Sequence, residues 1–131
     1  MADKILFDLV SPERLVLSRP ADMVTVPGSE GYMGVMAGHA SLVSTLRAGM
    51  IDMKDDGRDT RYFIRGGFVE INARKITVLA EEAVPISELD IAVLDQRIAD
   101  AQADEIAAKT DAERTRAAQL VDDLKLVRAA F

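Results

Sequence analysis

The distribution of glycine and proline divides the chain near residue 85. All eight glycines and all four prolines lie at or before Pro85, whereas residues 87–131 contain neither and include eleven alanines. Frequent glycine and proline interrupt helices, and a long alanine-rich stretch without them permits helices. The sequence therefore predicts a β domain over residues 1–86, followed by a helical domain over residues 87–131.

The first domain contains short runs rich in valine, isoleucine and phenylalanine between turn signals. Residues 51–54 alternate apolar and charged side chains, which is typical of a strand with one buried face. Asp55-Asp56-Gly57 and Asn72-Ala73 suit tight turns, because these residue types tolerate positive φ. About nine such strands predict two packed antiparallel sheets. The expected strands span residues 4–10, 14–18, 23–26, 33–36, 42–46, 50–54, 61–65, 68–72 and 75–80.

The second domain contains two helix-capping patterns. Ser87-Glu88-Leu89-Asp90 resembles a capping box with aspartate in place of glutamate, and Thr110-Asp111-Ala112-Glu113 fits the box fully. They predict helices over residues 88–108 and 111–129. The connection is so short that the helices should form an antiparallel hairpin. The apolar stripes expected to face inwards are Ile91, Leu94, Ile98 and Ala101 in the first helix, and Ala117, Leu120, Val121, Leu124, Val127 and Phe131 in the second.

The predicted hairpin has a thin core, because alanine occupies many of its facing positions. Alanine lets helix backbones approach closely but removes little apolar surface from water, and short helices are marginal in isolation. We therefore expect the hairpin to be detachable around residues 84–87.

Composition excludes several classes of function. The net charge of −6 disfavours nonspecific binding to nucleic acid or to anionic lipid. No apolar run approaches the roughly 20 residues of a membrane span, so direct membrane insertion is not expected. One histidine and no cysteine provide neither a disulfide framework nor a zinc site of ordinary spacing.

Catalytic and phosphate-binding motifs are weak. His39 and Ser41 lie close in sequence but lack the third group of a hydrolytic triad. The adjacent carboxylates of Glu81 and Glu82 would point to opposite faces of a strand. The Gly28–Gly31 spacing matches a nucleic-acid clamp, but Glu30 gives it the wrong charge. These features favour a binding or structural module. The alternatives are a small β-sandwich hydrolase that uses His39 and a helix-hairpin regulator of an unrelated complex.

The glycine-rich stretch Gly28-Ser29-Glu30-Gly31-Tyr32-Met33-Gly34-Val35-Met36-Ala37-Gly38-His39-Ala40-Ser41-Leu42 resembles the signature of the ε subunit of the bacterial F-type ATP synthase, the counterpart of the mitochondrial δ subunit. The resemblance covers residues 4–95 in order and at the spacing of that family. Further matching segments are Phe7-Asp8-Leu9-Val10-Ser11-Pro12-Glu13, Arg47-Ala48-Gly49-Met50-Ile51, Gly66-Gly67-Phe68-Val69-Glu70-Ile71 and Ile76-Thr77-Val78-Leu79-Ala80-Glu81.

This resemblance implies a rotor subunit of the central stalk without chemistry of its own. It implies a ten-stranded β-sandwich that links the γ subunit to the c-ring and so couples proton translocation to ATP synthesis. The complex would hold the chain at the cytoplasmic face of the bacterial inner membrane. The residues expected to contact the c-ring are Glu30, Gly31 and Tyr32, and those expected to contact γ are Ser11, His39 and Ser44.

In the family that the chain resembles, the hairpin also reaches up beside γ and restrains ATP hydrolysis through basic residues near the β subunit. The matching residues here are Arg114, Arg116, Lys125 and Arg128, although Asp122 and Asp123 interrupt the basic face. The α and β subunits are therefore further expected partners.

The start of the first predicted helix departs from the pattern of ATP-binding family members. Those members resemble Ile/Leu-Asp-x-x-Arg-Ala, whereas Val93 and Leu94 follow Leu89-Asp90-Ile91-Ala92 here. Arg97 follows Asp95 one residue too soon, and this slip turns the arginine by about 100° around the helix. We expect weak or absent nucleotide binding and no cofactor.

Overall fold

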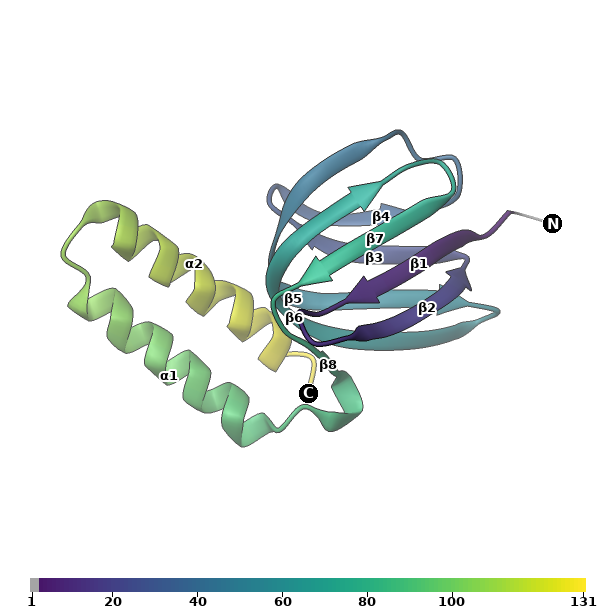
Figure 1. Ribbon diagram of the computed structural model, residues 1–131. Coiled ribbons are helices and arrows are strands. Elements are labelled where there is room, and N and C mark those ends of the chain that lie inside the picture. The colour runs from purple at the N-terminus through teal and green to yellow at the C-terminus, as the bar shows by residue number, and fades with distance from the viewer. Residues whose placement is uncertain (1–2) are drawn as a thin grey trace. The chain divides into compact units, whose positions relative to one another are not determined.

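The computed structural model describes residues 3–131, which divide into two compact units at Ile86 and Ser87 (Figure 1). The first unit is a β-sandwich and the second is a pair of helices. The strands are β1 (Ile5–Val10), β2 (Leu15–Ala21), β3 (Met23–Gly28), β4 (Gly31–Val35), β5 (Leu42–Asp55), β6 (Arg58–Ile71), β7 (Lys75–Ala80) and β8 (Ala83–Pro85). A 3-10 turn (Ile86–Glu88) precedes α1 (Ile91–Ala107) and α2 (Asp111–Arg128).

The strands of the first unit form one continuous hydrogen-bonded sheet that folds over on itself. Its order is β2-β1-β7-β6-β5-β3-β4, and β8 pairs with β6. The long strands β5 and β6 run from one layer into the other (Figure 1). The inward side chains of both layers meet in one apolar core, as alternation along strands requires. This core includes Phe7 and Leu9 of β1, Val24 and Val26 of β3, Ile51 and Met53 of β5, and Val78 of β7.

The described part of the chain has eight strands, so the expectation of nine or ten was too high. The runs at 42–46 and 50–54 belong to β5, and those at 61–65 and 68–72 belong to β6. The glycines between these runs bend the strands without ending them. Gly66 and Gly67 adopt positive φ inside β6, and a Cβ on Gly67 would lie 2.0 Å from the Leu79 carbonyl oxygen.

One strand pair differs from the predicted antiparallel arrangement. β1 and β7 pair in parallel, from Leu6 opposite Lys75 to Val10 opposite Leu79. A hairpin cannot join parallel strands, so such a pair needs a long connection. Here the intervening strands provide that connection, and a parallel pair forms without any crossover helix.

Both predicted tight turns are confirmed. Asp56 and Gly57 adopt φ values of 50° and 77° in the two-residue loop between β5 and β6. This loop therefore has the positive φ that favours Asp-Gly. In the β6–β7 turn, the side-chain oxygen of Asn72 accepts hydrogen bonds from the Arg74 and Lys75 amides, each at 2.9 Å.

The two helix starts differ in how well the sequence predicted them. Thr110 caps α2 as expected, because its hydroxyl oxygen accepts the Glu113 amide at 3.1 Å. The predicted cap at Ser87 is wrong. Residues Ile86–Glu88 form a 3-10 turn, and Asp90 caps α1 by accepting the Ala92 amide at 2.8 Å. Both residue types suit a cap, and the 3-10 turn moves the helix start three residues along.

The helices form the predicted antiparallel hairpin. Arg128, at the end of α2, donates a hydrogen bond from Nε to Asp95 near the start of α1 at 2.8 Å. Ile91, Leu120 and Phe131 are exposed rather than buried. Asp123, by contrast, is almost fully buried and accepts a hydrogen bond from Gln119 at 3.0 Å. The buried apolar side chains are Leu94, Ala101, Val121, Leu124 and Val127.

Candidate functional site

Glu30 lies at the tip of a two-residue turn between β3 and β4. Gly28 and Gly31 form the last pair of this hairpin, and Ser29 and Glu30 connect them. Gly31 has a φ of 128°, which side-chain-bearing residues rarely adopt. Glu30 is exposed at this tip, so its carboxylate is available to a partner.

Ser29 joins this turn to β5. Its amide donates to the Thr45 carbonyl at 3.1 Å, and its hydroxyl lies 3.3 Å from the Ser44 hydroxyl. Ser44 pairs with Val69 of β6, so both side chains lie on the core side of the sheet. The structure therefore brings Ser44, a predicted γ contact, together with the turn that carries Glu30. The role of Ser29 could not be predicted from local sequence, because its partner Ser44 lies 15 positions along the chain.

Tyr32 also reaches from this hairpin to β5. Its hydroxyl oxygen accepts a hydrogen bond from the Met50 amide at 3.2 Å. Half of the residue's surface is exposed, so one side of the ring faces solvent. Tyr32 thus combines an exposed face beside Glu30 with a fixed hydroxyl.

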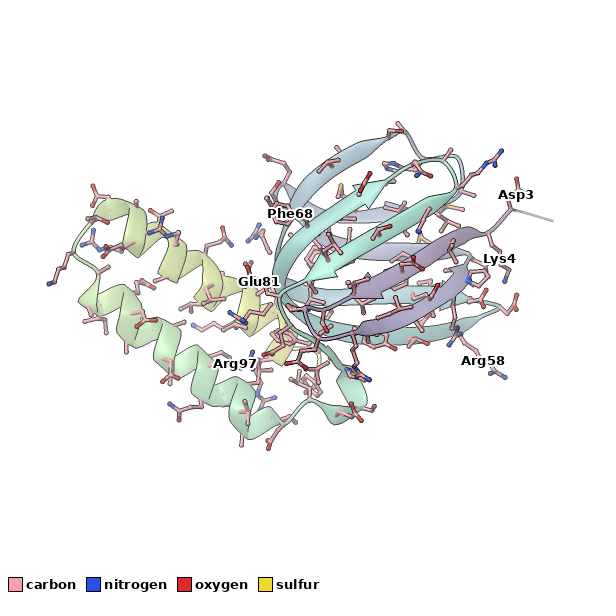
Figure 2. All side chains as sticks on the ribbon, viewed as in Figure 1. Asp3, Lys4, Arg58, Phe68, Glu81 and Arg97 are labelled. Atoms are coloured by element: carbon pink, nitrogen blue, oxygen red, sulfur yellow. The ribbon has the colours of Figure 1, made fainter. Side chains whose placement is uncertain are left out.

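Ser11 lies at the far end of β1, beside an open apolar hollow. Its amide and carbonyl pair with those of Arg14 across the β1–β2 turn. The aromatic ring of Phe68 and the side chain of Leu79 are both more than half exposed here. Phe68 and Glu81 lie at the opposite end of the β unit from Lys4 (Figure 2). The hollow is lined by Val10, Ser11, Pro12, Gly67, Phe68, Leu79, Ala80 and Glu81.

His39 occupies the turn before β5. Its Nδ1 lies 2.6 Å from the Ala40 carbonyl oxygen and, when protonated, donates a hydrogen bond to it. The adjacent Gly38 amide donates to the Ala73 carbonyl at the β6–β7 turn. Ser11 lies beside the other end of β6 and β7, near Gly67 and Ala80. The three predicted γ contacts are therefore spread over the unit rather than clustered.

A compact charge cluster lies at the end of the β unit that carries Lys4 (Figure 2). The carboxylates of Asp22, Asp55 and Asp56 lie within 4.8 Å of one another. The Lys4 ammonium forms ion pairs with all three. Its hydrogen bond to Asp55 is the main cause of a raised Lys4 pKa. This cation balances the carboxylates and ties β1 to the β5–β6 loop.

The four basic residues expected to contact the β subunit lie along α2 or beside its hairpin turn. Arg114 pairs with Asp111 at 2.9 Å, and Arg128 pairs with Asp95 at 2.8 Å. Arg116 lines a hollow near the helix connection with Asp104 and Glu113. Lys125 is exposed in the last turns of α2.

The sequence of the β-sandwich matches a known protein family. Residues 4–86 match the family described as "ATP synthase, Delta/Epsilon chain, beta-sandwich domain". The chain belongs to the ATP synthase delta/epsilon family. This agrees with the resemblance of the glycine-rich stretch and confirms the sandwich followed by two helices.

Relatives in the ATP synthase delta/epsilon family match along nearly the whole chain. The ATP synthase epsilon chain of Parvibaculum lavamentivorans is 51% identical and covers 98% of each chain. That of Maricaulis maris is 46% identical, with coverage of 98% of this chain and 97% of the relative. The helices are therefore included in these matches as well as the sandwich.

Solved structures give the same result. A chain of the Euglena gracilis mitochondrial ATP synthase, in a structure of its OSCP, F1 and c-ring, superposes with a TM-score of 0.80 at 27% identity. The match covers 99% of this delta/epsilon chain and 82% of the Euglena chain. A chain from the central stalk and c-ring of Tetrahymena thermophila, at 14% identity and a TM-score of 0.68, shares the fold.

The comparisons give no support to the alternative of a hydrolase that uses His39 or of a regulator of an unrelated complex. Within residues 3–131 of this delta/epsilon chain, no helix is long and apolar enough to cross a membrane.

Proposed function

We propose that this chain is the central-stalk rotor subunit of an F-type ATP synthase, where it links γ to the c-ring. The observation that carries the proposal is the match over the full length, sandwich and hairpin together, to relatives named ATP synthase epsilon chain and to a chain in an F1 and c-ring structure. The subunit carries no catalytic group and acts by mechanical contact. The complex holds it at the cytoplasmic face of the bacterial inner membrane.

The turn at Glu30 is the proposed contact with the c-ring. An exposed carboxylate at the tip of a short hairpin can reach polar or basic groups of a partner, and Ser29 and Tyr32 hold the hairpin to β5. Charges at the rim of an interface guide orientation and specificity more than affinity. Glu30, Gly31 and Tyr32 would therefore set how the subunit is seated on the ring.

The proposed contact with γ uses Ser11, His39 and Ser44. Ser11 borders the apolar hollow lined by Phe68 and Leu79. A partner that binds there would bury apolar surface next to the Ser11 hydroxyl. Ser44 lies under the Ser29 hydroxyl and would act on γ through the position of the turn. The ring and γ contacts are thus joined within one rigid unit.

The hairpin is proposed to restrain ATP hydrolysis through Arg114, Arg116, Lys125 and Arg128 at the β subunit. Two of these arginines already pair with aspartates of the hairpin, and both pairs are solvent-exposed. Exposed ion pairs contribute about 0–1 kcal/mol, so an acidic partner can replace them at little cost. Nucleotide binding by the hairpin is expected to be weak or absent.

The test of the ring contact is Glu30→Lys in the assembled enzyme. We expect the ratio of ATP synthesised to protons moved to fall severalfold, because the reversed charge opposes seating of the turn on the ring. The isolated chain should keep its thermal unfolding temperature, since Glu30 is exposed. Proton uptake and ATP synthesis in inverted membrane vesicles measure the effect.

Asp3→Lys is the matched control, because it makes the same charge change at an exposed position before β1, away from the proposed contacts. It should leave coupling unaltered. If Glu30→Lys preserves normal coupling, the ring contact is rejected. If γ and the c-ring do not co-purify with the native chain, the rotor assignment itself is rejected.

A further inference from the structure

The pairing of β3 with β5 is interrupted beside the Glu30 turn. Thr25 lies opposite Asp52 and Gly28 opposite Leu46, so β3 advances three residues while β5 advances six. Such a bulge leaves residues of the longer strand without ladder partners. Pro27 lies in this interval and has no amide hydrogen to contribute. On the side of β5 that faces β3, the backbone groups between Leu46 and Asp52 therefore need other hydrogen-bond partners.

Tyr32 supplies one of these bonds from two strands away. β4, which carries Tyr32, is the edge strand of the order β5-β3-β4, so its neighbour is β3 and not β5. Tyr32 pairs with Pro27 across the hairpin, and its hydroxyl continues beyond β3 to the Met50 amide of β5 at 3.2 Å. A buried or half-buried amide without a partner costs free energy, so this hydroxyl stabilises the bulge.

Gly49 provides the space for this arrangement. A Cβ at position 49 would lie 2.6 Å from the Tyr32 hydroxyl oxygen and 2.9 Å from the Pro27 Cβ. Any side chain there would push the hydroxyl away from Met50. Gly49 does not need positive φ, so its role is the close approach of Tyr32 and Pro27 to the backbone.

We propose that Tyr32 is a positioning residue that anchors edge strand β4 to β5 across β3 and thereby fixes the turn that presents Glu30. The turn has a second attachment at Ser29, whose amide and hydroxyl meet Thr45 and Ser44. The two attachments lie on opposite sides of Glu30 in the sequence. Only the last consequence, that a loosened turn impairs coupling, rests on the proposed function.

The anchoring is tested on the isolated full-length chain. The chain contains no cysteine, so Glu30→Cys allows a single nitroxide label at the tip of the turn. Tyr32→Phe keeps the ring and removes the hydroxyl. In this variant we expect the Met50 amide to exchange about three- to tenfold faster and the label to become more mobile, because one hydrogen bond is lost. Gly49→Ala should have the same two effects.

Tyr62→Phe is the matched control, because it removes the same group from a tyrosine on β6. It should leave the Met50 exchange rate and the label unchanged. Unchanged exchange and mobility in Tyr32→Phe would overturn the proposal. Should Gly49→Ala fail to fold, Tyr32→Phe still decides the question, since its ring and packing are retained.

Coupling in the assembled enzyme separates the two proposals. We expect Tyr32→Phe to lower coupling less than Glu30→Lys does. If Tyr32→Phe loosens the turn but only Glu30→Lys impairs coupling, the anchoring of the turn by Tyr32 is supported, and the expectation that a loosened turn impairs coupling is overturned. If neither variant changes coupling, the ring contact under the proposed function is rejected, while the exchange measurements independently support the anchoring of β4 to β5.

Discussion

At the scale of single residues, Asp8 shows how one outward side chain joins three strands. Its carboxylate accepts a hydrogen bond from the Ser18 hydroxyl of β2 at 2.6 Å. It also forms an ion pair with the Lys75 ammonium of β7 at 3.0 Å. The Ser18 hydrogen bond is the main cause of a lowered Asp8 pKa, and Lys75 adds to it. The ionised form is therefore favoured in the folded protein.

A lowered pKa in the fold stabilises the protein above the ordinary aspartate pKa of about 3.9, and this stabilisation is lost as pH falls through the folded value. We expect Ser18→Ala to raise the Asp8 pKa and to lower the free energy of unfolding by about 1 kcal/mol at pH 7. The deficit should shrink at acid pH. Urea unfolding at pH 7 and pH 3 measures it. Ser87→Ala, at an exposed serine outside both helix caps, is the control, and an equal loss there would contradict the assignment.

Some residue-scale features were predictable and others were not. Asp-Gly and Asn in tight turns follow from local backbone preference, and both turns formed as predicted. The Tyr32–Met50 bond depends on a bulge that changes which residues of β5 face β3. Nothing in the sequence near Tyr32 specifies that register, so its partner could not be predicted.

At the scale of elements, the cap at Thr110 fixes the residue at which α2 begins after the turn between the helices. Thr110 accepts the Glu113 amide, and the Glu113 carboxylate in turn accepts the Lys109 amide at 3.1 Å. These side chains accept hydrogen bonds from backbone amides that have no partner within the helix. The short connection between the helices therefore depends on two side chains.

We expect Thr110→Ala to destabilise the first turn of α2 by about 1 kcal/mol, because the cap is lost. Amide exchange in that turn should accelerate, while exchange in the β-sandwich stays constant. Thr110→Ser should restore protection. Thr115→Ala, at an exposed position inside the same helix, is the control and should not accelerate exchange. Equal protection in the Thr110→Ala and parent chains would show that the cap does not stabilise α2.

The element boundaries show where local patterns stop being informative. The glycines at 49, 66 and 67 suggested breaks, but the pairing between β5 and β6 continues at Gly49 opposite Ile64 and at Gly67 opposite Leu46, so both strands run on through them. The start of α1 differed for another reason. Ser87 and Asp90 are both suitable caps, and only the 3-10 turn at Ile86–Glu88 decides between them.

At the scale of the whole molecule, the apolar core of the sandwich lies entirely within residues 5–83. The hairpin buries fewer large side chains, chiefly Leu94, Val121, Leu124 and Val127. We therefore propose two domains, 1–86 and 87–131, of unequal independent stability. Short helices with little buried apolar area are marginal in water.

A chain that ends at Ile86 should keep the β-sheet circular dichroism of the intact protein and unfold cooperatively. In the assembled enzyme it should raise ATP hydrolysis, because the proposed restraint by the hairpin is absent. Charge reversal at Arg114, Arg116, Lys125 and Arg128 in the full chain is the companion variant, since it keeps the helices. Unchanged hydrolysis in both would reject the regulatory role, and loss of cooperative unfolding after truncation would reject the domain boundary.

The broad architecture was predictable because glycine and proline change so sharply at residue 85. The folding of one sheet over itself was not, because it depends on two strands of 14 residues that bend between layers. The contact residues for γ and the c-ring stay predictions that rest on the resemblance to the family. These residues are exposed or half-buried, and most of them are polar, which is common on protein surfaces, so no local pattern identifies their partner.

The parallel pairing of β1 with β7 has a mechanical consequence. The first strand of the sandwich is bonded along five residue pairs to the strand that precedes β8 and the exit towards the hairpin. A force that separates the two ends of the sandwich along the strands would load these bonds together, in shear, rather than opening them one after another. The unit should therefore resist a pull between its two chain ends more strongly than a sheet whose hydrogen bonds open one at a time.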